Sequence, residues 1–295
     1  MKGNIIMKKL LLIVDMQNDF VTGPLGTNEA QAIVSDMTTF AEQFDGDIAF
    51  TKDTHSNDYL STQEGQKLPI AHTVKNTEGW QIINELRHIE HRPDVRIFEK
   101  PVFGSADLYE FLKAQCKHKD RYTDLYLVGV CTGICVLSNA VLARTADPEL
   151  NIHVIDDLCA CIDYHTNHTA LNALQTLQVT RWKLKTETLM LSKAKYNEMQ
   201  QDLQETEDFK RLCQKYNRYD TRTWTVPFGH STEIDLKFCI GDTHDETSNP
   251  CWFETVLFHE GCEYTCSEAM DEIPDVITMT NPKIHTIYQV RINLI

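Results

Sequence analysis

The sequence predicts an α/β fold: a doubly wound, mostly parallel six-stranded sheet with helices on both faces, followed by a smaller, mainly β C-terminal module. Over residues 8–193, short aliphatic and β-branched runs alternate with segments of helical periodicity. The strand-like runs are almost continuously apolar, which is typical of parallel strands buried on both faces. The chain has 295 residues, of which 42% are hydrophobic, enough for one such domain and a smaller second one.

The predicted strands are short apolar segments bounded by polar or glycine-containing turns. This arrangement is typical of strands that alternate with helices in parallel sheets. They are expected at residues 9–14, 47–51, 95–98, 124–130, 152–155 and 180–184.

Helices are expected between these strands, where apolar residues recur every three or four positions. The helix over residues 105–116 is predicted to begin after Ser105, because serine caps helix N-termini well. The predicted helices cover residues 28–44, 78–89, 105–116, 134–144 and 164–177.

The last third of the chain has a different pattern. Residues 195–216 are predicted to form a polar, charged helix, and the following short alternating runs, separated by prolines, indicate a small antiparallel β module. We therefore expect two domains, 1–193 and 194–295, the second with no assigned function. Its cysteines match no strong zinc pattern, so reduced thiols are the simpler interpretation. The runs cover residues 223–228, 233–240, 252–259 and 283–293.

Charge and cysteine content argue against several classes of protein. The net charge of −15 repels phosphate backbones and anionic lipids, so we expect no nucleic-acid or membrane partner. No apolar run approaches the ~20 residues that span a bilayer. The apolar segment over residues 10–14 is too short for a signal peptide. Ten cysteines without a secretion signal then indicate reduced thiols in a cytoplasmic protein.

Reactive side chains follow four of the predicted strands. Ligands of open α/β sheets bind beyond the carboxyl ends of the strands, so these residues are expected at one edge. A polar residue at a strand end is often only a turn former or a helix cap, but several at the same edge favour an active site. The residues are Asp15, Asp53, His55, Lys100, Cys131 and Cys135.

Five motifs in this part of the chain resemble the isochorismatase-like cysteine hydrolases. IVDMQNDF at residues 13–20, FEKPVFGS at 98–105 and VGVCTGICV at 128–136 carry the resemblance to the superfamily. TKDTHSNDYL at 51–60 and LPIAHTVKNTEGW at 68–80 resemble its nicotinamidase/pyrazinamidase branch. The resemblance covers roughly residues 8–190 and leaves the C-terminal module without a counterpart.

The resemblance implies a catalytic triad of Asp15, Lys100 and Cys135. The chemistry is consistent with these residue types. A free thiol has a pKa of ~8.5 and attacks well only as the thiolate. Helix dipoles near Cys135 and the charge of Lys100 are expected to favour that thiolate. Asp15 is expected to take the thiol proton and later pass it to a leaving amine.

The resemblance also assigns a role to the backbone around Cys131. Its N–H and that of Cys135 are implied to form an oxyanion hole, and the peptide bond Val130–Cys131 is implied to be cis. From the residues alone, a CxxxC pair also suggests redox chemistry or metal binding. We expect the Cys131 side chain itself only to pack.

A metal site is predicted from Asp53, His55 and His72. An acid and an imidazole two residues apart can face one ion, and a third ligand from a later loop leaves positions open for water or substrate. The resemblance implies the same three ligands. Oxygen and nitrogen donors accept zinc, iron or manganese, so the identity of the one divalent ion stays open. The alternative is two surface histidines and a turn aspartate.

The substrate pocket is predicted from Phe20, Leu68 and Trp80. Leu68 stands where nicotinamidases often carry an aromatic residue, and Thr73 and Asn76 also depart from the usual pattern. These departures leave the hydrolase prediction intact and weaken the assignment of the substrate.

The predicted function is that of a metal-assisted cysteine amidohydrolase that converts nicotinamide and water to nicotinate and ammonia, with a role in NAD salvage implied by the resemblance. Its partner would be a small amide, and a homo-oligomer stays open. One alternative keeps the triad but changes the substrate to another amide, a ureido compound or isochorismate. A second alternative is a non-catalytic scaffold whose C-terminal module binds proteins.

Overall fold

The computed structural model describes residues 8–191, 193–194, 197, 220–228, 232–240, 251–259, 262–268, 276–281 and 285–294. The chain divides into two compact units, Met1–Lys183 and Leu184–Ile295. The domain boundary expected at residue 193 stays a prediction. Among the described residues, no helix combines the length and apolar character that crossing a bilayer requires.

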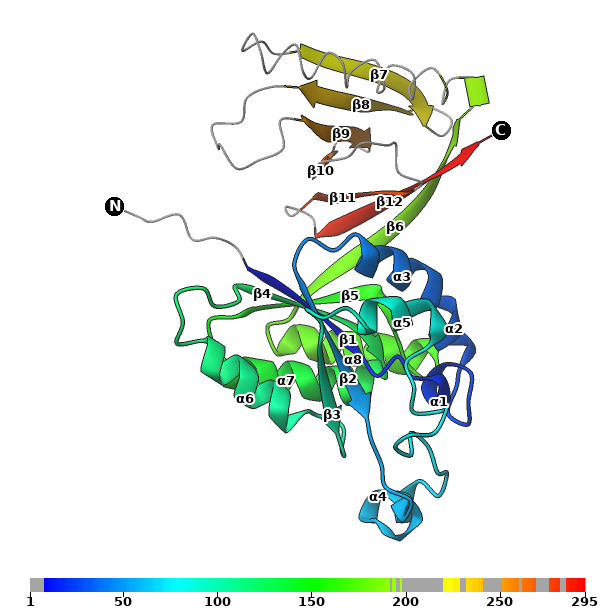
Figure 1. Ribbon diagram of the computed structural model, residues 1–295, viewed down its shortest axis with the longest axis vertical. Coiled ribbons are helices and arrows are strands. Elements are labelled where there is room, and N and C mark those ends of the chain that lie inside the picture. Colours follow the sequence, from blue (N-terminus) through cyan, green and yellow to red (C-terminus); the bar gives the residue numbers. More distant parts are fainter. Residues whose placement is uncertain are drawn as a thin grey trace. The chain divides into compact units, whose positions relative to one another are not determined.

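The first unit contains a parallel sheet with the strand order β3-β2-β1-β4-β5-β6 (Figure 1). All five pairings between neighbouring strands in this order are parallel, which confirms the predicted six-stranded sheet. The strand order reverses between β1 and β4, and ligands of such sheets bind beyond the strand ends at this point. The strands are β1 (Lys9–Val14), β2 (Asp47–Asp53), β3 (Arg96–Lys100), β4 (Asp124–Val130), β5 (Asn151–Ala160) and β6 (Thr180–Leu191).

Helices cover both faces of this sheet. Figure 1 shows α6, α7 and α8 on one face and α2, α3 and α5 on the other. A short 3₁₀ turn, η1 (Tyr59–Ser61), and a π-helical turn, η2 (Thr132–Val136), complete the connections. The helices are α1 (Asn18–Val21), α2 (Asn28–Ala32), α3 (Val34–Glu42), α4 (Gln63–Lys67), α5 (Asn84–Glu90), α6 (Ala106–Gln115), α7 (Leu137–Ala146) and α8 (Tyr164–Thr176).

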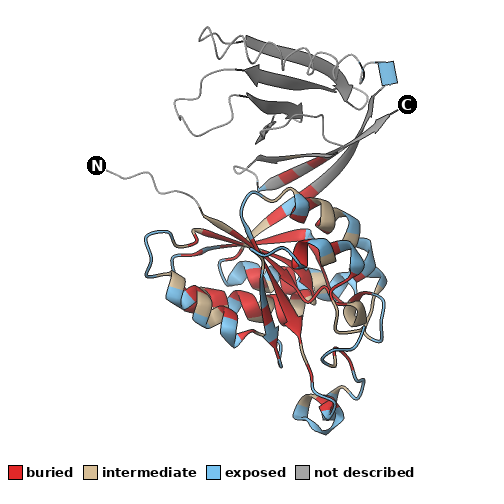
Figure 2. Ribbon diagram, in the orientation of Figure 1, coloured by how far each residue is buried: buried red, intermediate tan, exposed pale blue. Residues whose placement is uncertain are grey.

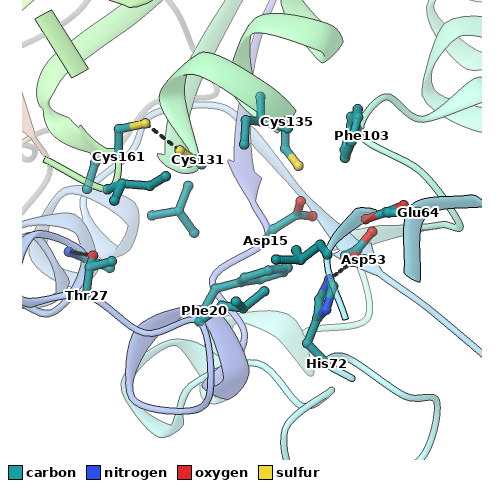
Figure 3. A pocket seen from close by; sticks show the side chains of 17 residues that line it. Asp15, Phe20, Thr27, Asp53, Glu64, His72, Phe103, Cys131, Cys135 and Cys161 are labelled. Atoms are coloured by element: carbon teal, nitrogen blue, oxygen red, sulfur yellow. Dashed lines mark hydrogen bonds and ion pairs between the residues drawn. The ribbon is translucent and has the colours of Figure 1, made fainter. Parts of the chain in front are cut away.

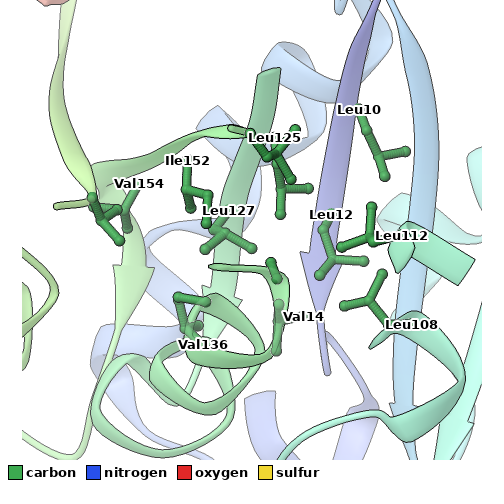
Figure 4. Packing of buried hydrophobic residues seen from close by; sticks show 14 of the residues in the cluster. Leu10, Leu12, Val14, Leu108, Leu112, Leu125, Leu127, Val136, Ile152 and Val154 are labelled. Carbon is green, nitrogen blue, oxygen red and sulfur yellow. The ribbon is translucent and has the colours of Figure 1, made fainter. Parts of the chain in front are cut away.

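The central strand β1 is buried on both faces, as its continuous apolar sequence predicts. Leu10 and Leu12 belong to the cluster between the sheet and α6, α7 and α8 (Figure 4). Leu11 and Ile13 alternate with them and are also fully buried, so they face the opposite layer. Figure 2 shows that buried residues concentrate in these strands. Complete burial of one such side chain contributes about 1.5–3 kcal/mol.

Two predicted helices are wrong in extent. The helix expected over residues 28–44 is two helices, α2 and α3, which meet at Ile33. The helix expected over residues 78–89 begins only at Asn84. In the segment before it, the carbonyls of Glu78 and Trp80 accept hydrogen bonds from the side chains of Asn18 and Gln17, at 2.8 Å each. This segment therefore forms hydrogen bonds with the residues that follow β1 and is not part of a helix.

The C-terminal unit contains an antiparallel meander in the order β7 to β12, consistent with the predicted β module. Two of its strands, β10 and β11, were not expected from the sequence. The charged helix predicted over residues 195–216 lies almost entirely outside the described residues. The strands are β7 (Asp220–Phe228), β8 (Thr232–Ile240), β9 (Cys251–His259), β10 (Cys262–Glu268), β11 (Val276–Asn281) and β12 (Thr286–Leu294).

Gly129 allows the two central strands to approach closely at the edge where the reactive residues lie. Its φ is +117°, and a Cβ atom there would lie 2.2 Å from the carbonyl oxygen of Val14. Only glycine combines this backbone conformation with so close a contact.

We therefore expect Gly129→Ala to lower the free energy of unfolding by at least about 2 kcal/mol, because it adds backbone strain and a clash. Urea denaturation followed by circular dichroism measures this change. Gly104→Ala is the matched control, since its Cβ would meet the flexible end of the Leu142 side chain at 2.6 Å and the Ser138 Cβ at an ordinary 3.4 Å, with no backbone atom among its nearest neighbours. Equal losses in the two variants would contradict the prediction.

Candidate active site

The residues predicted from the strand ends do lie together. Asp15 follows β1 directly, Asp53 ends β2, Lys100 ends β3, and Cys135 lies in η2 after β4. Asp53 and Lys100 are register partners on the parallel strands β2 and β3, so their side chains lie next to each other. Figure 3 shows the sulfur of Cys135 turned toward Asp15.

Lys100 is the centre of the cluster. Its Nζ lies 2.7 Å from Asp15 Oδ2, 3.2 Å from Asp53 Oδ1 and 3.6 Å from Cys135 Sγ. All four side chains are buried, and Lys100 is 1% exposed. A buried ammonium needs this number of partners, because loss of hydration is costly for a charge. The pKa of Lys100 is raised although burial opposes its charge, since Asp15, Cys135 and Asp53 favour the ammonium.

The surroundings of the Cys135 thiol act on its pKa in opposite directions. Burial raises the pKa of Cys135 well above its usual range, and the charge of Asp15 raises it further, while Lys100 acts in the opposite direction. Lys100 therefore favours the thiolate, as expected, but burial has the larger effect on the pKa of Cys135. Burial also raises the pKa of Asp15, against the effect of Lys100. A carboxylate of raised pKa is a stronger base, so it is better suited to take the thiol proton.

The turn that carries Cys135 is fixed from α7. The side chain of the buried Asn139 donates to the Cys135 carbonyl at 2.8 Å and accepts from the N–H of Ser105 at 3.0 Å. It thus ties η2 to the loop that follows β3 and Lys100. The peptide bond Val130–Cys131 just before this turn is cis, as the resemblance implied.

Asp53, His55 and His72 form a second cluster next to the first. Their ligand atoms all lie within 4.8 Å of one another, and the three residues are buried. Asp53 Oδ2 lies 2.9 Å from His55 Nε2 and 3.6 Å from His72 Nε2. His55 Nε2 is close to the carboxylate but makes no hydrogen bond, which is the state expected of a nitrogen that serves a cation. The Nδ1 of His72 is bound to the Ile70 carbonyl at 2.8 Å, which leaves its Nε2 facing the cluster.

This donor set, one oxygen and two imidazole nitrogens, fits a divalent transition metal or zinc with open positions. Burial opposes ionisation of Asp53, yet the close approach of the two histidines and the charge of Lys100 lower the pKa of Asp53. The carboxylate is therefore ionised at neutral pH, as a metal ligand must be.

Gln17 holds Asp53 in place, and sequence reasoning missed it. Its amide is fully buried; the Nε2 donates to the Asp53 carbonyl at 2.8 Å, and the Oε1 accepts the Asp53 N–H at 2.7 Å. Thr73 adds a bond from Oγ1 to Asp53 Oδ2 at 2.9 Å. The Thr73 N–H in turn donates to Asp19 Oδ2 at 2.7 Å. The only signal for these roles was the position of Gln17 and Asp19 in the same motif as Asp15.

A cavity of about 120 Å³ joins the two clusters. Asp15, Asp53, His72, Cys131 and Cys135 line it, as do two of the predicted pocket residues, Phe20 and Leu68 (Figure 3). The lining residues that sequence reasoning missed are Leu25, Thr27, Ala30, Glu64, Phe103, Val130, Ile134, Ala160, Cys161 and Ile162.

Trp80 does not line this cavity, contrary to the prediction. Its indole N–H donates to the hydroxyl of Thr54 at 2.8 Å, and the Nζ of Lys52 lies 3.5 Å from the ring centroid. Lys52 is paired with Glu90 at 3.1 Å, and both side chains are buried. Trp80 therefore covers the buried ion pair between Lys52, a residue of β2, and Glu90.

Glu64 is a further carboxylate at the wall of the cavity. Its Oε1 lies 3.9 Å from His55 Nε2, next to the metal-type cluster. Nothing in the spacing of the motifs singled it out, because α4 brings it to the cavity from an intervening loop.

Comparison with known proteins agrees with this geometry. The family model described as Isochorismatase domain matches residues 9–186. A relative from Bacillus subtilis, described as an uncharacterized isochorismatase family protein PncA, is 31% identical over 161 residues, which is 50% of this chain and 84% of that protein. The nicotinamidase of Saccharomyces cerevisiae is 26% identical over 175 residues, 46% of this chain and 81% of that enzyme.

Solved structures show the same fold. The pyrazinamidase/nicotinamidase of Streptococcus mutans has a TM-score of 0.51 and 26% identity, and the match covers 59% of this chain and 99% of that one. The pyrazinamidase of Pyrococcus horikoshii, solved in complex with zinc, has a TM-score of 0.51 and 22% identity, with 60% and 99% of the two chains covered.

The buried hydroxyl of Thr51 gives a test of the site geometry. It donates to Asp15 Oδ1 at 2.7 Å. We expect Thr51→Val to lower the free energy of unfolding by about 1–3 kcal/mol, because a buried carboxylate oxygen loses its donor. Chemical denaturation measures the loss. In the control Thr145→Val, an exposed hydroxyl that donates to the Val141 carbonyl is removed, and the change should stay within about 0.5 kcal/mol. A loss no larger than in this control would refute the role assigned to Thr51.

Proposed function

The chain belongs to the isochorismatase family, and from this premise we propose that it is a metal-assisted cysteine amidohydrolase that converts nicotinamide and water to nicotinate and ammonia. One observation carries the proposal: a single buried ammonium, Lys100, contacts the thiol of Cys135, the carboxylate of Asp15 and the ligand-type carboxylate of Asp53. The similarity to the yeast nicotinamidase, over 81% of that enzyme, supports the choice of substrate.

In the proposed mechanism Cys135 is the nucleophile and Asp15 the base. As the sulfur attacks the amide carbon, Asp15 takes the thiol proton, so no free thiolate has to persist in the buried site. The N–H groups of Cys131 and Cys135 donate hydrogen bonds to the carbonyl oxygen as negative charge develops on it. When the C–N bond breaks, Asp15 returns the proton to the leaving ammonia and a thioester remains. Asp15 then takes a proton from the water that attacks the thioester carbon. The C–S bond breaks, the acid leaves, and Asp15 returns the proton to the sulfur of Cys135. Lys100 keeps its proton throughout and holds the side chains of Asp15 and Cys135 next to each other.

We assign the divalent ion to Asp53, His55 and His72, with Glu64 at the edge of the set. When bound, such an ion supplies a Lewis acid for a ring nitrogen or for water. The shared contact with Lys100 keeps this site near the nucleophile: Asp53 Oδ1 and Cys135 Sγ lie 3.2 Å and 3.6 Å from the same Nζ atom. A substrate the size of nicotinamide can therefore reach both.

The character of the cavity favours an uncharged substrate. Neither arginine nor lysine is among the residues that line it, whereas Asp15, Asp53 and Glu64 are. Apolar side chains, including Phe20 and Leu68, offer a surface for a flat ring. The lining offers no arginine or lysine to bind the carboxylates of an anionic substrate such as isochorismate, so we place that alternative second. A non-catalytic scaffold would have no need for the buried charges. The proposed cellular role is cytoplasmic NAD salvage.

We expect Cys135→Ala to lower turnover by several powers of ten, on the order of 10⁴-fold or more, because the covalent nucleophile is lost. Cys131→Ala should keep much of the activity, since it leaves the backbone N–H in place. Ammonia release from nicotinamide, measured on both purified variants, checks the prediction. If the two folded variants lose activity equally, the assignment of the nucleophile is wrong.

The second prediction concerns metal content. Purified protein should hold about one divalent ion per chain. His55→Ala and His72→Ala should lose most of it, because each removes one of the proposed protein ligands. Elemental analysis by mass spectrometry measures the ion directly. His88→Ala is a suitable control, since His88 is exposed and pairs with Glu42 at 3.0 Å, away from the site. Retention of the ion in both ligand variants would rule out this site.

A further inference from the structure

Two thiols that the proposed mechanism does not use face each other in the wall of the cavity. The sulfur atoms of Cys131 and Cys161 lie 2.6 Å apart (Figure 3). Cys161 is buried and Cys131 is half-buried, and both line the cavity. The sequence predicted packing for Cys131 and no role for Cys161, so this contact is a feature that only the fold reveals.

The backbone holds this pair in place. Val130 and Ala160 are register partners on the parallel strands β4 and β5, and the two cysteines directly follow them. Neighbouring strands lie about 4.8 Å apart, and a disulfide needs its Cα atoms roughly 4.4–6.8 Å apart. The register therefore brings the two cysteine positions near the separation that a disulfide requires.

The other nearby thiols are directed elsewhere. Cys135 turns its sulfur to Lys100, at 3.6 Å, and to Asp15 (Figure 3). Cys159 is buried, with its sulfur 3.7 Å from the Leu127 carbonyl. Four thiols lie near the ends of β4 and β5, and only those of Cys131 and Cys161 face each other.

We propose that Cys131 and Cys161 form a redox-active dithiol that hydroperoxides convert reversibly to a disulfide in the wall of the substrate cavity. The Cys131 sulfur attacks one peroxide oxygen, the O–O bond breaks, and one water leaves with a sulfenic acid formed on Cys131. The Cys161 sulfur then displaces the hydroxyl of that sulfenic acid as a second water. In sum, two thiols and one hydrogen peroxide give one disulfide and two waters.

The surroundings set the conditions under which this occurs. Burial, and then the contact with Cys161, raise the pKa of Cys131 to about 12, so Cys131 rests as a thiol at neutral pH. Oxidation is accordingly slow and requires sustained peroxide. Bond formation draws the sulfurs from 2.6 Å to about 2.05 Å and joins the ends of the neighbouring strands β4 and β5. Because Cys131 also carries an N–H of the proposed oxyanion hole, its redox state acts on the active site.

The experiment uses the full chain with Cys135→Ala, which removes the competing nucleophile. The protein is incubated with hydrogen peroxide, alkylated, digested and mapped by mass spectrometry with fragmentation. We expect a peptide pair linked through Cys131 and Cys161, lost on treatment with dithiothreitol, while Cys159 stays alkylatable after unfolding. The oxidised chain should also melt several degrees above the reduced chain, because a cross-link restricts the unfolded state.

The matched control adds Cys161→Ser to the same chain. It should give neither a link from Cys131 to Cys159 nor an increase in melting temperature with peroxide. The proposal is overturned if Cys131 becomes sulfinic acid without forming a link, or if Cys131 links to another cysteine in the control as readily as to Cys161 in the parent chain. None of these measurements depends on nicotinamide turnover, so the outcome is independent of the proposed function.

Discussion

The structure of the site depends on one buried ammonium. Lys100 ends an outer strand of the sheet, while Asp15 and Cys135 come from the two central strands between which the strand order reverses. Three contacts within 3.6 Å bring these segments to one point. Without its carboxylates, a charge buried this deeply would cost several kcal/mol. The same requirement that stabilises Lys100 therefore fixes the base and the nucleophile next to each other.

The fold supplies this arrangement through the backbone. A parallel sheet directs all its carboxyl ends to one edge, and β1 and β4 meet there at the distance that Gly129 allows. Side chains from neighbouring segments then hold the reactive residues at the strand ends in place. Asn139 holds the turn of Cys135, and Gln17 holds both backbone groups of Asp53. Reactive groups placed on strand ends and fixed by buried amides need little reorganisation during the reaction.

The sequence predicted the strands of the parallel sheet because most of them contain a short apolar run, and it predicted the reactive residues because they lie at or just after strand ends. It could not predict features that depend on contacts between distant segments. The segment before Asn84 has a helical pattern, but Gln17 and Asn18 use its carbonyls. Trp80 belongs to a motif next to the metal-type cluster, yet its ring covers Lys52. The thiol of Cys135 has a cation beside it, but complete burial has the larger effect on its pKa.

The two clusters of the site are not independent, because Asp53 belongs to both. One of its oxygens, Oδ1, faces Lys100, and the other, Oδ2, faces His55 and His72. Removal of this carboxylate would abolish a metal ligand and would also leave the Lys100 ammonium with Asp15 as its one carboxylate partner. The two histidines contribute to the metal-type cluster alone. A variant of Asp53 therefore cannot separate metal binding from support of the nucleophile, whereas variants of the histidines can. The coupling follows from the strand register, which pairs Asp53 with Lys100.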